Sequence, residues 1–558
     1  MVLKKKFNPN RARLEKRKRK GKDDENDGEV KKAKKNHDLN SKQFHDITVL
    51  LETMKKRFPT FKEKEDKANE AFAEMEVDLS VYSNNFLGSQ ALEIMIPLLS
   101  VENLQKCFAV YQSQVGAYCN EKCGGKTLQT VIKEAGKRSY SHANDEHKIA
   151  CREAVLSFSK AIINLTESLI TNTYGSHTLR SVLFAMSQLK DSKKDDQKIL
   201  PEYVEILQNF GTKLFGFNKF KFYAFHKMGT ETVKVTMKVL DQLKSDLLRQ
   251  YIQTILKHLT LKMIFETPVA TLVLETVLLL SNAEEHAQVY ETFFKGKLSK
   301  TFYERNGSHI VTRILENIRD KETFKAIYSE FKTEFKKLVA ADKLALLEIL
   351  CRECKKQEVN QKEFMKRIRK AYTCRTEDKL DKFVICLATN TQFKELQETY
   401  DFRAFDLNIH GTVMIQLLCE YQDPQIVVNG FLAMPSEQLL ALFANRKGCY
   451  MADSYFKSET IDREAKKRMF KKFRNMFKDL LKDEGGAKGF IAIWNGVDQS
   501  QKSVIAKELK GDESWLENDF GAKVAEKIHY ELYKSDKAAW KTKIEEKPTV
   551  SLLKLFKK

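Results

Sequence analysis

The segments YGSHTLRSVL (residues 174–183) and NGSHIVTRIL (residues 306–315) share one order of residue types. A small residue is followed by three variable positions, an aliphatic residue, a polar residue and a further apolar half-turn. The same order recurs in GSQALE from Gly88, GGKTLQ from Gly124, GTETVK from Gly229, ATLVLE from Ala270, GTVMIQ from Gly411, GCYMAD from Gly448 and GAKVAE from Gly521. Two weaker copies are KLALLE from Lys343 and GAKGFI from Gly486. Apolar residues at this spacing predict that each copy opens a helix.

The copies follow one another at similar intervals, as in an internal repeat. Gly448 follows Gly411 by 37 residues, and Gly486 follows Gly448 by 38. Longer intervals hold polar insertions such as SQLKDSKKDDQK after Met186, and the 68 residues between Lys343 and Gly411 suggest a degenerate unit around residues 383–387. A unit of this size cannot bury its apolar face alone, so neighbouring units must stack. The sequence predicts an all-α solenoid of about eleven repeats over residues 45–545.

Charge is high and unevenly spread. The net charge is +21, and residues 1–35 hold fifteen Lys and Arg against six Asp and Glu. An excess of this size favours a polyanionic partner. Residues 1–40 are predicted to be a basic disordered tail, either solubilising or carrying a nuclear-targeting signal, and residues 546–558 a second basic tail. The targeting signal is assigned to Lys16, Arg17, Lys18, Arg19 and Lys20.

Sequence signatures of catalysis, metal binding and membrane insertion are incomplete. NEKCGGKT (residues 120–127) ends like a phosphate-binding loop but has Asn120 where that loop needs glycine. The cysteine pairs Cys119 with Cys123 and Cys351 with Cys354 have no second pair at zinc-finger spacing. No uncharged apolar run is long enough to span a bilayer. We therefore expect no enzyme activity, no metal, no cofactor and no membrane partner.

The recurring hexapeptide predicts which side chains face outward. Helical geometry places the two residues after the small residue on the solvent side, and the residue four beyond the first returns to the same face. Ser176 and Arg180 should then project together with His177 turned to one side, while Thr178 and Leu179 point into the stack. Two adjacent polar groups can hydrogen-bond the edge of one base, and the offset residue can stack on it.

This pattern resembles the Pumilio (PUF) repeat. With GCYMADSYF (residues 448–456), NDFGAKVAEKIHYELYKSDKAAW (residues 518–540) and the basic tail, the chain is similar to the nucleolar Pumilio-like family of small-subunit pre-ribosomal RNA processing. The resemblance implies a C- or U-shaped solenoid in the nucleolus that holds single-stranded and structured RNA on its concave face. It implies precursor ribosomal RNA and other pre-ribosome assembly proteins as partners, a part in 40S ribosome biogenesis, a monomeric state and no catalysis.

Carried over repeat by repeat, the resemblance implies RNA contacts at the first, second and fifth positions after the small residue. The candidates are Ser89, Gln90, Glu93, Lys126, Gln129, Ser176, His177, Arg180, Thr230, Lys234, Ser308, His309, Thr312, Thr412, Val413, Gln416, Cys449, Tyr450, Asp453, Lys523 and Glu526. His177, His309 and Tyr450 are the expected stacking residues. PUF repeats mostly have Gln or Glu at the fifth position, where this chain has Arg180, Lys234, Thr312 and Asp453. Arg and Lys suit phosphates better than base edges. Leu272 and Leu344 stand where polar residues are needed. We expect partial sequence preference and not a base-by-base code.

Two other functions fit the same composition. A protein-binding solenoid, such as a transport adaptor or assembly scaffold, would show an acidic or apolar inner face. A Pumilio-like protein that grips nucleic acid without sequence preference would ignore base identity.

Overall fold

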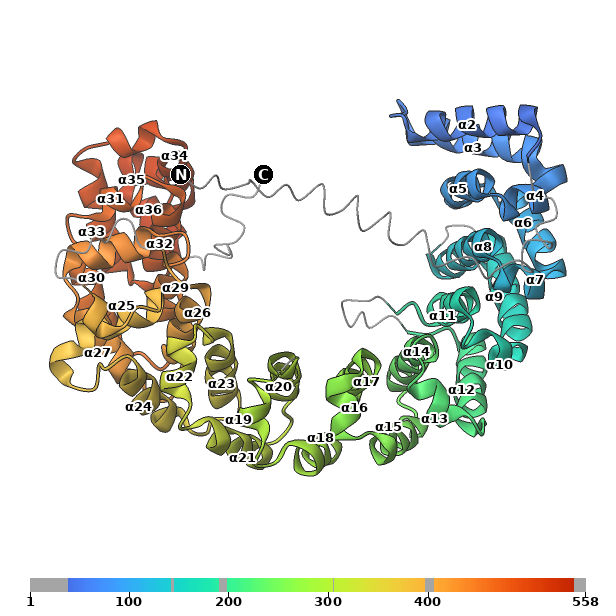
Figure 1. The fold of residues 1–558 in the computed structure, drawn as a ribbon. Helices are drawn as coiled ribbons and strands as arrows, with labels where there is room; N and C mark the ends of the chain where they lie inside the picture. Colours follow the sequence, from blue (N-terminus) through green and yellow to red (C-terminus); the bar gives the residue numbers. More distant parts are fainter. Residues whose placement is uncertain (1–38, 142–144, 190–197, 305, 397–405, 546–558) are drawn as a thin grey trace, which may run out of the picture. The chain divides into compact units, whose positions relative to one another are not determined.

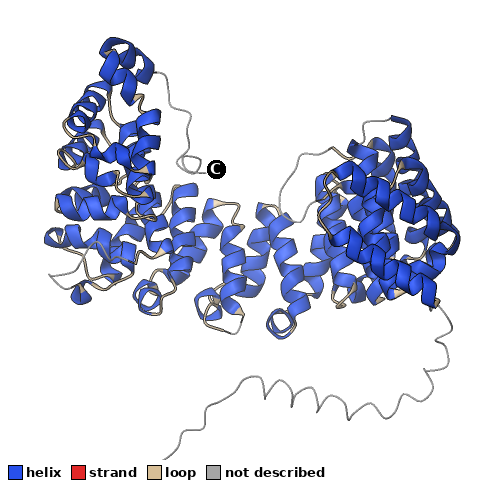
Figure 2. Ribbon diagram, turned by 90° about the horizontal axis from the view of Figure 1, so that it is seen from above, coloured by secondary structure: helices blue, strands red, loops and turns tan. Residues whose placement is uncertain are grey.

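The computed structural model describes residues 39–141, 145–189, 198–304, 306–396 and 406–545. Residues 1–38 of the predicted N-terminal tail, with the targeting signal, and the whole predicted C-terminal tail lie outside these ranges. The described part is helical and contains no strand (Figure 2). Two compact units divide the chain, one ending at His258 and the other beginning at Leu259. An all-α solenoid is therefore confirmed.

The first unit contains four three-helix repeats behind an N-terminal pair, α2 (Ser41–Lys55) and α3 (Phe61–Met75). In each repeat a short first helix leads into a second helix and then a third. The first helices are α4 (Leu79–Asn84), α7 (Val115–Asn120), α10 (Thr166–Leu169) and α13 (Phe220–Ala224). The second helices are α5 (Phe86–Met95), α8 (Lys122–Ser141), α11 (Thr173–Ser187) and α14 (Gly229–Gln242). The third helices are α6 (Val101–Ser113), α9 (Asp145–Asn164), α12 (Pro201–Gly216) and α15 (Leu247–His258).

The second unit continues the same order through seven repeats. Its first helices are α16 (Leu261–Glu266), α19 (Leu298–Thr301), α22 (Phe335–Ala340), α25 (Leu380–Thr389), α28 (Ser436–Ala444), α31 (Phe477–Leu480) and the 3₁₀ turn η8 (Ser514–Glu517). Its second helices are α17 (Pro268–Leu280), α20 (Gly307–Glu316), α23 (Leu344–Lys356), α26 (Ile409–Leu418), α29 (Cys449–Lys457), α32 (Glu484–Gly496) and α34 (Asp519–Lys527). Its third helices are α18 (Ala283–Val289), α21 (Lys321–Phe331), α24 (Gln361–Ala371), α27 (Gln425–Ala433), α30 (Arg463–Lys472), α33 (Gln499–Lys510) and α35 (Tyr530–Ser535), and α36 (Lys537–Glu545) closes the array. Each of the eleven predicted hexapeptides lies at the start of a second helix.

The small residue of the hexapeptide lets the second helix start directly against the end of the first helix. A Cβ on Gly307 would lie 1.7 Å from the carbonyl oxygen of Thr301, and one on Gly448 would lie 1.8 Å from that of Leu442. In both cases the contacted carbonyl belongs to the residue six positions earlier. A side chain cannot fit there without separating the two helices, and this explains why a glycine marks most repeats.

An asparagine three residues before the glycine caps several second helices. The side-chain oxygen of Asn172 accepts the backbone N–H groups of Tyr174 and Gly175 at 2.8 and 2.9 Å. Asn85, Asn408 and Asn518 make the same pair of hydrogen bonds in their own repeats. N-cap residues of this kind satisfy helix N–H groups that have no partner inside the helix. These caps were not predicted, although the pattern Asn-x-x-Gly is visible in the sequence.

The described residues of the long interval before Gly411 form no extra repeat. The ten-residue α25 covers the suspected residues 383–387, and the carbonyl oxygen of Leu387 lies 2.0 Å from a Cβ built on Gly411. Leu387 thus takes the place that the residue six positions earlier has in other repeats. The prediction of a degenerate unit is wrong, because α25 is the first helix of the repeat and an insertion separates it from α26.

The core is continuous along each unit. The third and fourth residues after the small residue face inward, as predicted: Thr178 and Leu179 are at most 1% exposed. Burying an aliphatic side chain of this size contributes about 1.5–3 kcal/mol.

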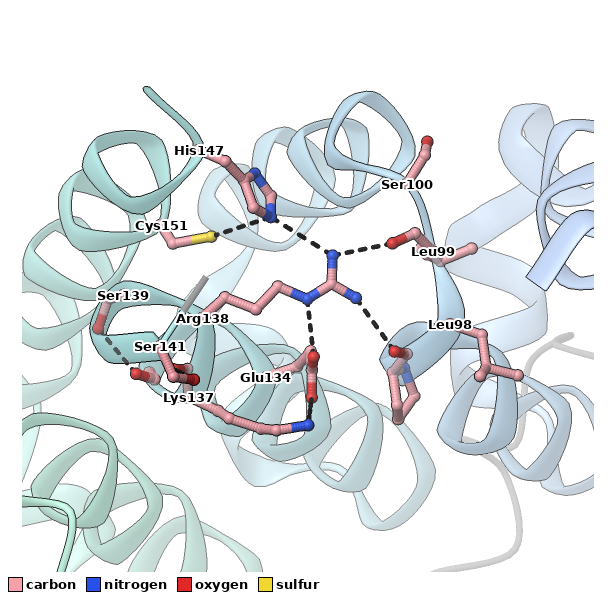
Figure 3. Close-up of polar contacts among 12 residues, drawn as sticks. Leu98, Leu99, Ser100, Glu134, Lys137, Arg138, Ser139, Ser141, His147 and Cys151 are labelled. Carbon is pink, nitrogen blue, oxygen red and sulfur yellow. Dashed lines mark hydrogen bonds and ion pairs between the residues drawn. The ribbon is translucent and has the colours of Figure 1, made fainter. Parts of the chain in front are cut away.

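Polar contacts also join adjacent repeats (Figure 3). Arg138 of α8, paired with Glu134 at 2.7 Å, donates to the carbonyls of Leu99 and Pro97 at 2.8 and 3.1 Å. Both carbonyls belong to the segment that leads into α6 of the preceding repeat, so this arginine fixes one repeat on the next.

No single helix among the described residues is long and apolar enough to cross a membrane. The pair α27 and α28 passes that test only when taken together, and it is bent by 111°.

Candidate nucleic-acid interface

The second helices form a row along one side of each unit (Figure 1). In the first unit α5, α8, α11 and α14 contact one another in order, and the third helices α6, α9, α12 and α15 lie on the other side. In the second unit α17, α20, α23, α26, α29, α32 and α34 also contact one another in order. We call the exposed side of these rows the second-helix face. It brings the hexapeptides of each unit onto a common surface.

The first position after the small residue is buried in most repeats. Ser89, Ser176, Thr230, Thr412 and Cys449 are 0–2% exposed. Their side chains donate to nearby backbone carbonyls, as Ser176 does to Thr173 at 3.3 Å and Thr412 to Ile409 at 2.8 Å. The prediction that this residue faces solvent is therefore wrong for these five positions. A short polar side chain at this position finds its hydrogen-bond acceptor within the first helical turn, and the neighbouring first helix covers it. Only Ser308 among the candidates at this position is exposed.

The second position is fully or partly open to solvent in these repeats, in keeping with the prediction. Lys126, His177, His309 and Lys523 are exposed, whereas Gln90, Val413 and Tyr450 are half-buried. The residue types differ from repeat to repeat and include cations, imidazoles, an amide and a phenol. This mixture can make ion pairs with phosphates and stack on bases.

The fifth position is half-buried at the seam between neighbouring second helices. Glu93, Gln129, Arg180, Lys234, Thr312, Gln416 and Asp453 have intermediate exposure, and Glu526 is exposed. Glu93 Oε1, Arg180 Nη1 and Asp453 Oδ1 are buried without a hydrogen-bond partner. Buried polar atoms nearly always have partners in folded proteins. Similar atoms also occur outside the hexapeptides, as at Tyr203 and Asp320, so the fifth position is a packed polar seam whose outer edge alone can meet a ligand.

His177 and Arg180 form the best-defined pair on the face. Arg180 Nη2 donates to Nδ1 of His177 at 2.8 Å, so this ring nitrogen carries no proton. Desolvation lowers the pKa of His177, and the adjacent guanidinium of Arg180 lowers it further. Burial also lowers the pKa of Arg180. The pair offers an exposed, neutral aromatic ring held beside a guanidinium, which suits stacking on a base close to a positive charge.

Histidine–carboxylate contacts join neighbouring repeats in the second unit. His309 of α20 pairs with Glu275 of α17. His410 Nδ1 of α26 lies 2.7 Å from Glu348 Oε2 of α23. Both glutamates stand at the fifth position of their hexapeptides. These roles were not predicted from the sequence, because the contacts cross repeat boundaries.

The described part of the chain contains no cluster of three or more His, Cys, Asp or Glu side chains that could hold a metal ion. Burial raises the pKa of Cys351 and of Cys119 to about 12, so both remain thiols. These residues fill the core.

The chain is a stack of three-helix units, and in most of them a glycine at the start of the second helix packs against the preceding helix. This architecture is that of a Pumilio-type repeat protein. A family model described as the NOP9-like PUF repeat domain matches residues 202–521, more than half of the chain. The chain belongs to this family, which confirms the resemblance found in the sequence.

Whole-chain comparisons agree with this assignment. Nucleolar protein 9 of mouse is 18% identical over 536 residues, covering 86% of this chain and 84% of the relative. Human nucleolar protein 9 is 18% identical over 550 residues, covering 88% and 86%. The solved APUM23–GGAGUUGACGG structure matches with a TM-score of 0.71 at 14% identity, covering 91% of this chain and 100% of that chain. The likeness to the solved structure shows the fold.

Proposed function

We propose that this protein binds precursor ribosomal RNA of the small subunit through its second-helix face and takes part in 40S ribosome assembly in the nucleolus. The observation that carries the proposal is the row of second helices, which places the exposed second and half-buried fifth positions of each unit on one surface. Supporting it are the exposed cations and imidazoles at the second position, and the similar fold of APUM23, solved with an oligonucleotide that contains uridines. The nucleolar location rests on relatives named nucleolar protein 9. The protein acts by binding, without catalysis.

The burial of the first position reduces the set of residues that we propose as RNA contacts. Ser89, Ser176, Thr230, Thr412 and Cys449 hold the helix start, and the second and fifth positions carry the RNA contacts. Arg180 and Lys234 lie at the fifth position, where a cation favours phosphate over a base edge. The protein thus combines sequence preference in some repeats with backbone recognition in others.

Replacing His177 and Arg180 together by alanine is expected to weaken RNA binding by about ten- to thirtyfold. Stacking on one base is worth about 1–3 kcal/mol, and the guanidinium contact is lost with it. The measurement is fluorescence anisotropy with single-stranded segments of small-subunit precursor ribosomal RNA. Lys160→Ala is the matched control, because Lys160 is exposed on the third helix α9 and its loss also removes one positive charge. Unchanged affinity of a folded double variant contradicts the proposal.

We further propose that residues 16–20 direct nuclear import, and that the array over residues 45–545 binds RNA without either tail. A chain lacking residues 1–40 should then remain in the cytoplasm, as followed by fluorescence microscopy of a tagged protein. Its RNA affinity should fall only modestly. Normal nuclear accumulation of the shortened chain refutes the targeting role alone.

A further inference from the structure

A strongly basic cavity lies in the second unit, away from the second-helix face. Its volume is about 520 Å³, and it is lined by Lys332, Thr333, Phe335, Lys336, Arg367, Lys370, Ala371, Thr373, Arg375, Thr376 and Lys379. None of these residues belongs to a second helix. They come from the third helix α24, the first helix α22 and the two turns that connect a third helix with the next first helix. We call this surface the junction cavity.

Most cations of the junction cavity are free to meet a ligand. Lys332, Lys336, Lys370 and Arg375 are exposed, and none forms an ion pair with a carboxylate of the described residues. Arg367 is paired with Glu363 at 2.5 Å, and Lys379 lies over the ring of Phe393. The lining contains no acidic residue. Cations near helix C-termini stabilise the helix dipole, but that effect does not require four of them to converge on one hollow from separate elements.

The turn that carries Arg375 is held in place by another arginine. Arg369 donates to the carbonyls of Cys374, Arg375 and Thr376 at 2.9, 2.6 and 3.3 Å. Thr373 begins this turn with a left-handed backbone, at a φ of 61°. The backbone that carries Arg375 is therefore held by the fold before any ligand arrives, which lowers the entropy lost on binding.

The preceding junction between repeats of the second unit is also lined by lysines. The preceding junction contributes Lys297 and Lys300 to a neighbouring cavity of about 440 Å³, whose lining also includes Glu304. Neither lysine is ion-paired with a described carboxylate. Positive charge thus recurs at three successive junctions between repeats, at the spacing of the repeat itself. A polymer with regularly spaced negative charges fits such an arrangement better than a single anion does.

We propose that the junction cavity binds the phosphodiester backbone of RNA, as a second contact surface for a segment that extends beyond the second-helix face. This inference rests on the proposed RNA-binding function. An acidic protein segment would need apolar anchors as well as charge. The apolar lining offers none, because Phe335 and Ala371 are at most 2% exposed. The threonine hydroxyls at 333, 373 and 376 and the lysine ammonium groups are suited to phosphate oxygens. The site reads no bases and accepts single-stranded or duplex RNA.

The test compares two triple variants of the full chain. The junction variant is Lys336→Gln with Lys370→Gln and Arg375→Gln. The control variant is Lys321→Gln with Lys325→Gln and Lys362→Gln, which removes the same charge from exposed positions on α21 and α24 outside the cavity. Each protein is titrated with a short single-stranded RNA, and with the same RNA extended by a single-stranded or a hairpin segment.

The junction variant should bind the short RNA like the unchanged protein and bind at least one of the extended RNAs about tenfold or more weakly. Its salt dependence on a hairpin extension should fall by about two to three units of slope, as expected for the loss of three phosphate contacts. The control variant should match the unchanged protein throughout. The extension that loses affinity tells whether one strand or a duplex occupies the cavity.

Three results would contradict either the junction site or the proposed RNA-binding function. Equal binding of both extended RNAs by the two triple variants overturns the junction site. Binding of a poly-glutamate peptide as tight as that of the extended RNAs, lost only in the junction variant, replaces RNA with an acidic protein partner. Failure of the unchanged protein to bind even the short RNA refutes the proposed function itself.

Discussion

Replacing Gly307 by alanine is expected to destabilise the second unit by about 3 kcal/mol or more. The new Cβ would lie 1.7 Å from the carbonyl oxygen of Thr301 and 2.8 Å from its carbonyl carbon. Both atoms belong to backbone, so no side-chain rotation can relieve the overlap. Helix α20 must then move away from α19, which opens the packing around Ile310 and Val311, both at most 1% exposed. Overpacking of this kind costs about 1–3 kcal/mol in ordinary cores and more where backbone must shift.

Urea unfolding of the full chain, followed by circular dichroism, measures this loss. Gly511→Ala is the matched control in the same unit, because the atom nearest to its new Cβ is the carbonyl oxygen of Glu508 at an ordinary 3.5 Å. That variant should change the unfolding free energy by no more than about 0.5 kcal/mol. Amide hydrogen exchange should show the weakening of Gly307→Ala first in residues 298–331. Equal stability of both variants would mean that the glycine does not set the distance between first and second helices.

The sequence predicted the repeat and its register well because both depend on local pattern. Glycines at a near-constant interval, followed by apolar residues at helical spacing, are sufficient to identify stacked helices. The same pattern gave the inward direction of Thr178 and Leu179 correctly. It failed at the 68-residue interval, since α25 looks like the core of a repeat but acts as an elongated first helix.

The interface was harder to predict, because it depends on contacts between repeats. Helical geometry alone puts Ser176 on the solvent side, yet the preceding first helix covers it. Likewise the partner of Glu348 is His410, 62 residues away in sequence. The junction cavity was also missed, since its cations lie in turns outside the hexapeptide pattern. Contacts between segments far apart in the sequence can be identified only from the folded structure, whereas periodicity can be identified from the sequence alone.

RNA affinity is expected to fall about a hundredfold between about 50 and 200 mM salt on a short single-stranded RNA. Exposed lysines lie at the starts of several second helices: Lys122, Lys126, Lys227, Lys447 and Lys523. If about five phosphates are neutralised, counterion release gives a slope near −3.5 for log affinity against log salt. Fluorescence anisotropy at a series of salt concentrations measures this slope. A slope near zero would contradict phosphate contacts by these lysines.

The same titration separates sequence preference from electrostatic binding when it is repeated with a scrambled RNA of equal length. Phosphate contacts act alike on both RNAs, so the two slopes should agree. The difference in affinity should persist at every salt concentration, because it comes from stacking and hydrogen bonds at the second and fifth positions. If both RNAs bind equally at all concentrations, the protein grips nucleic acid without reading it. In that case Arg180 meets phosphate, the carboxylates of Glu93 and Asp453 meet water, and none of the three reads a base edge.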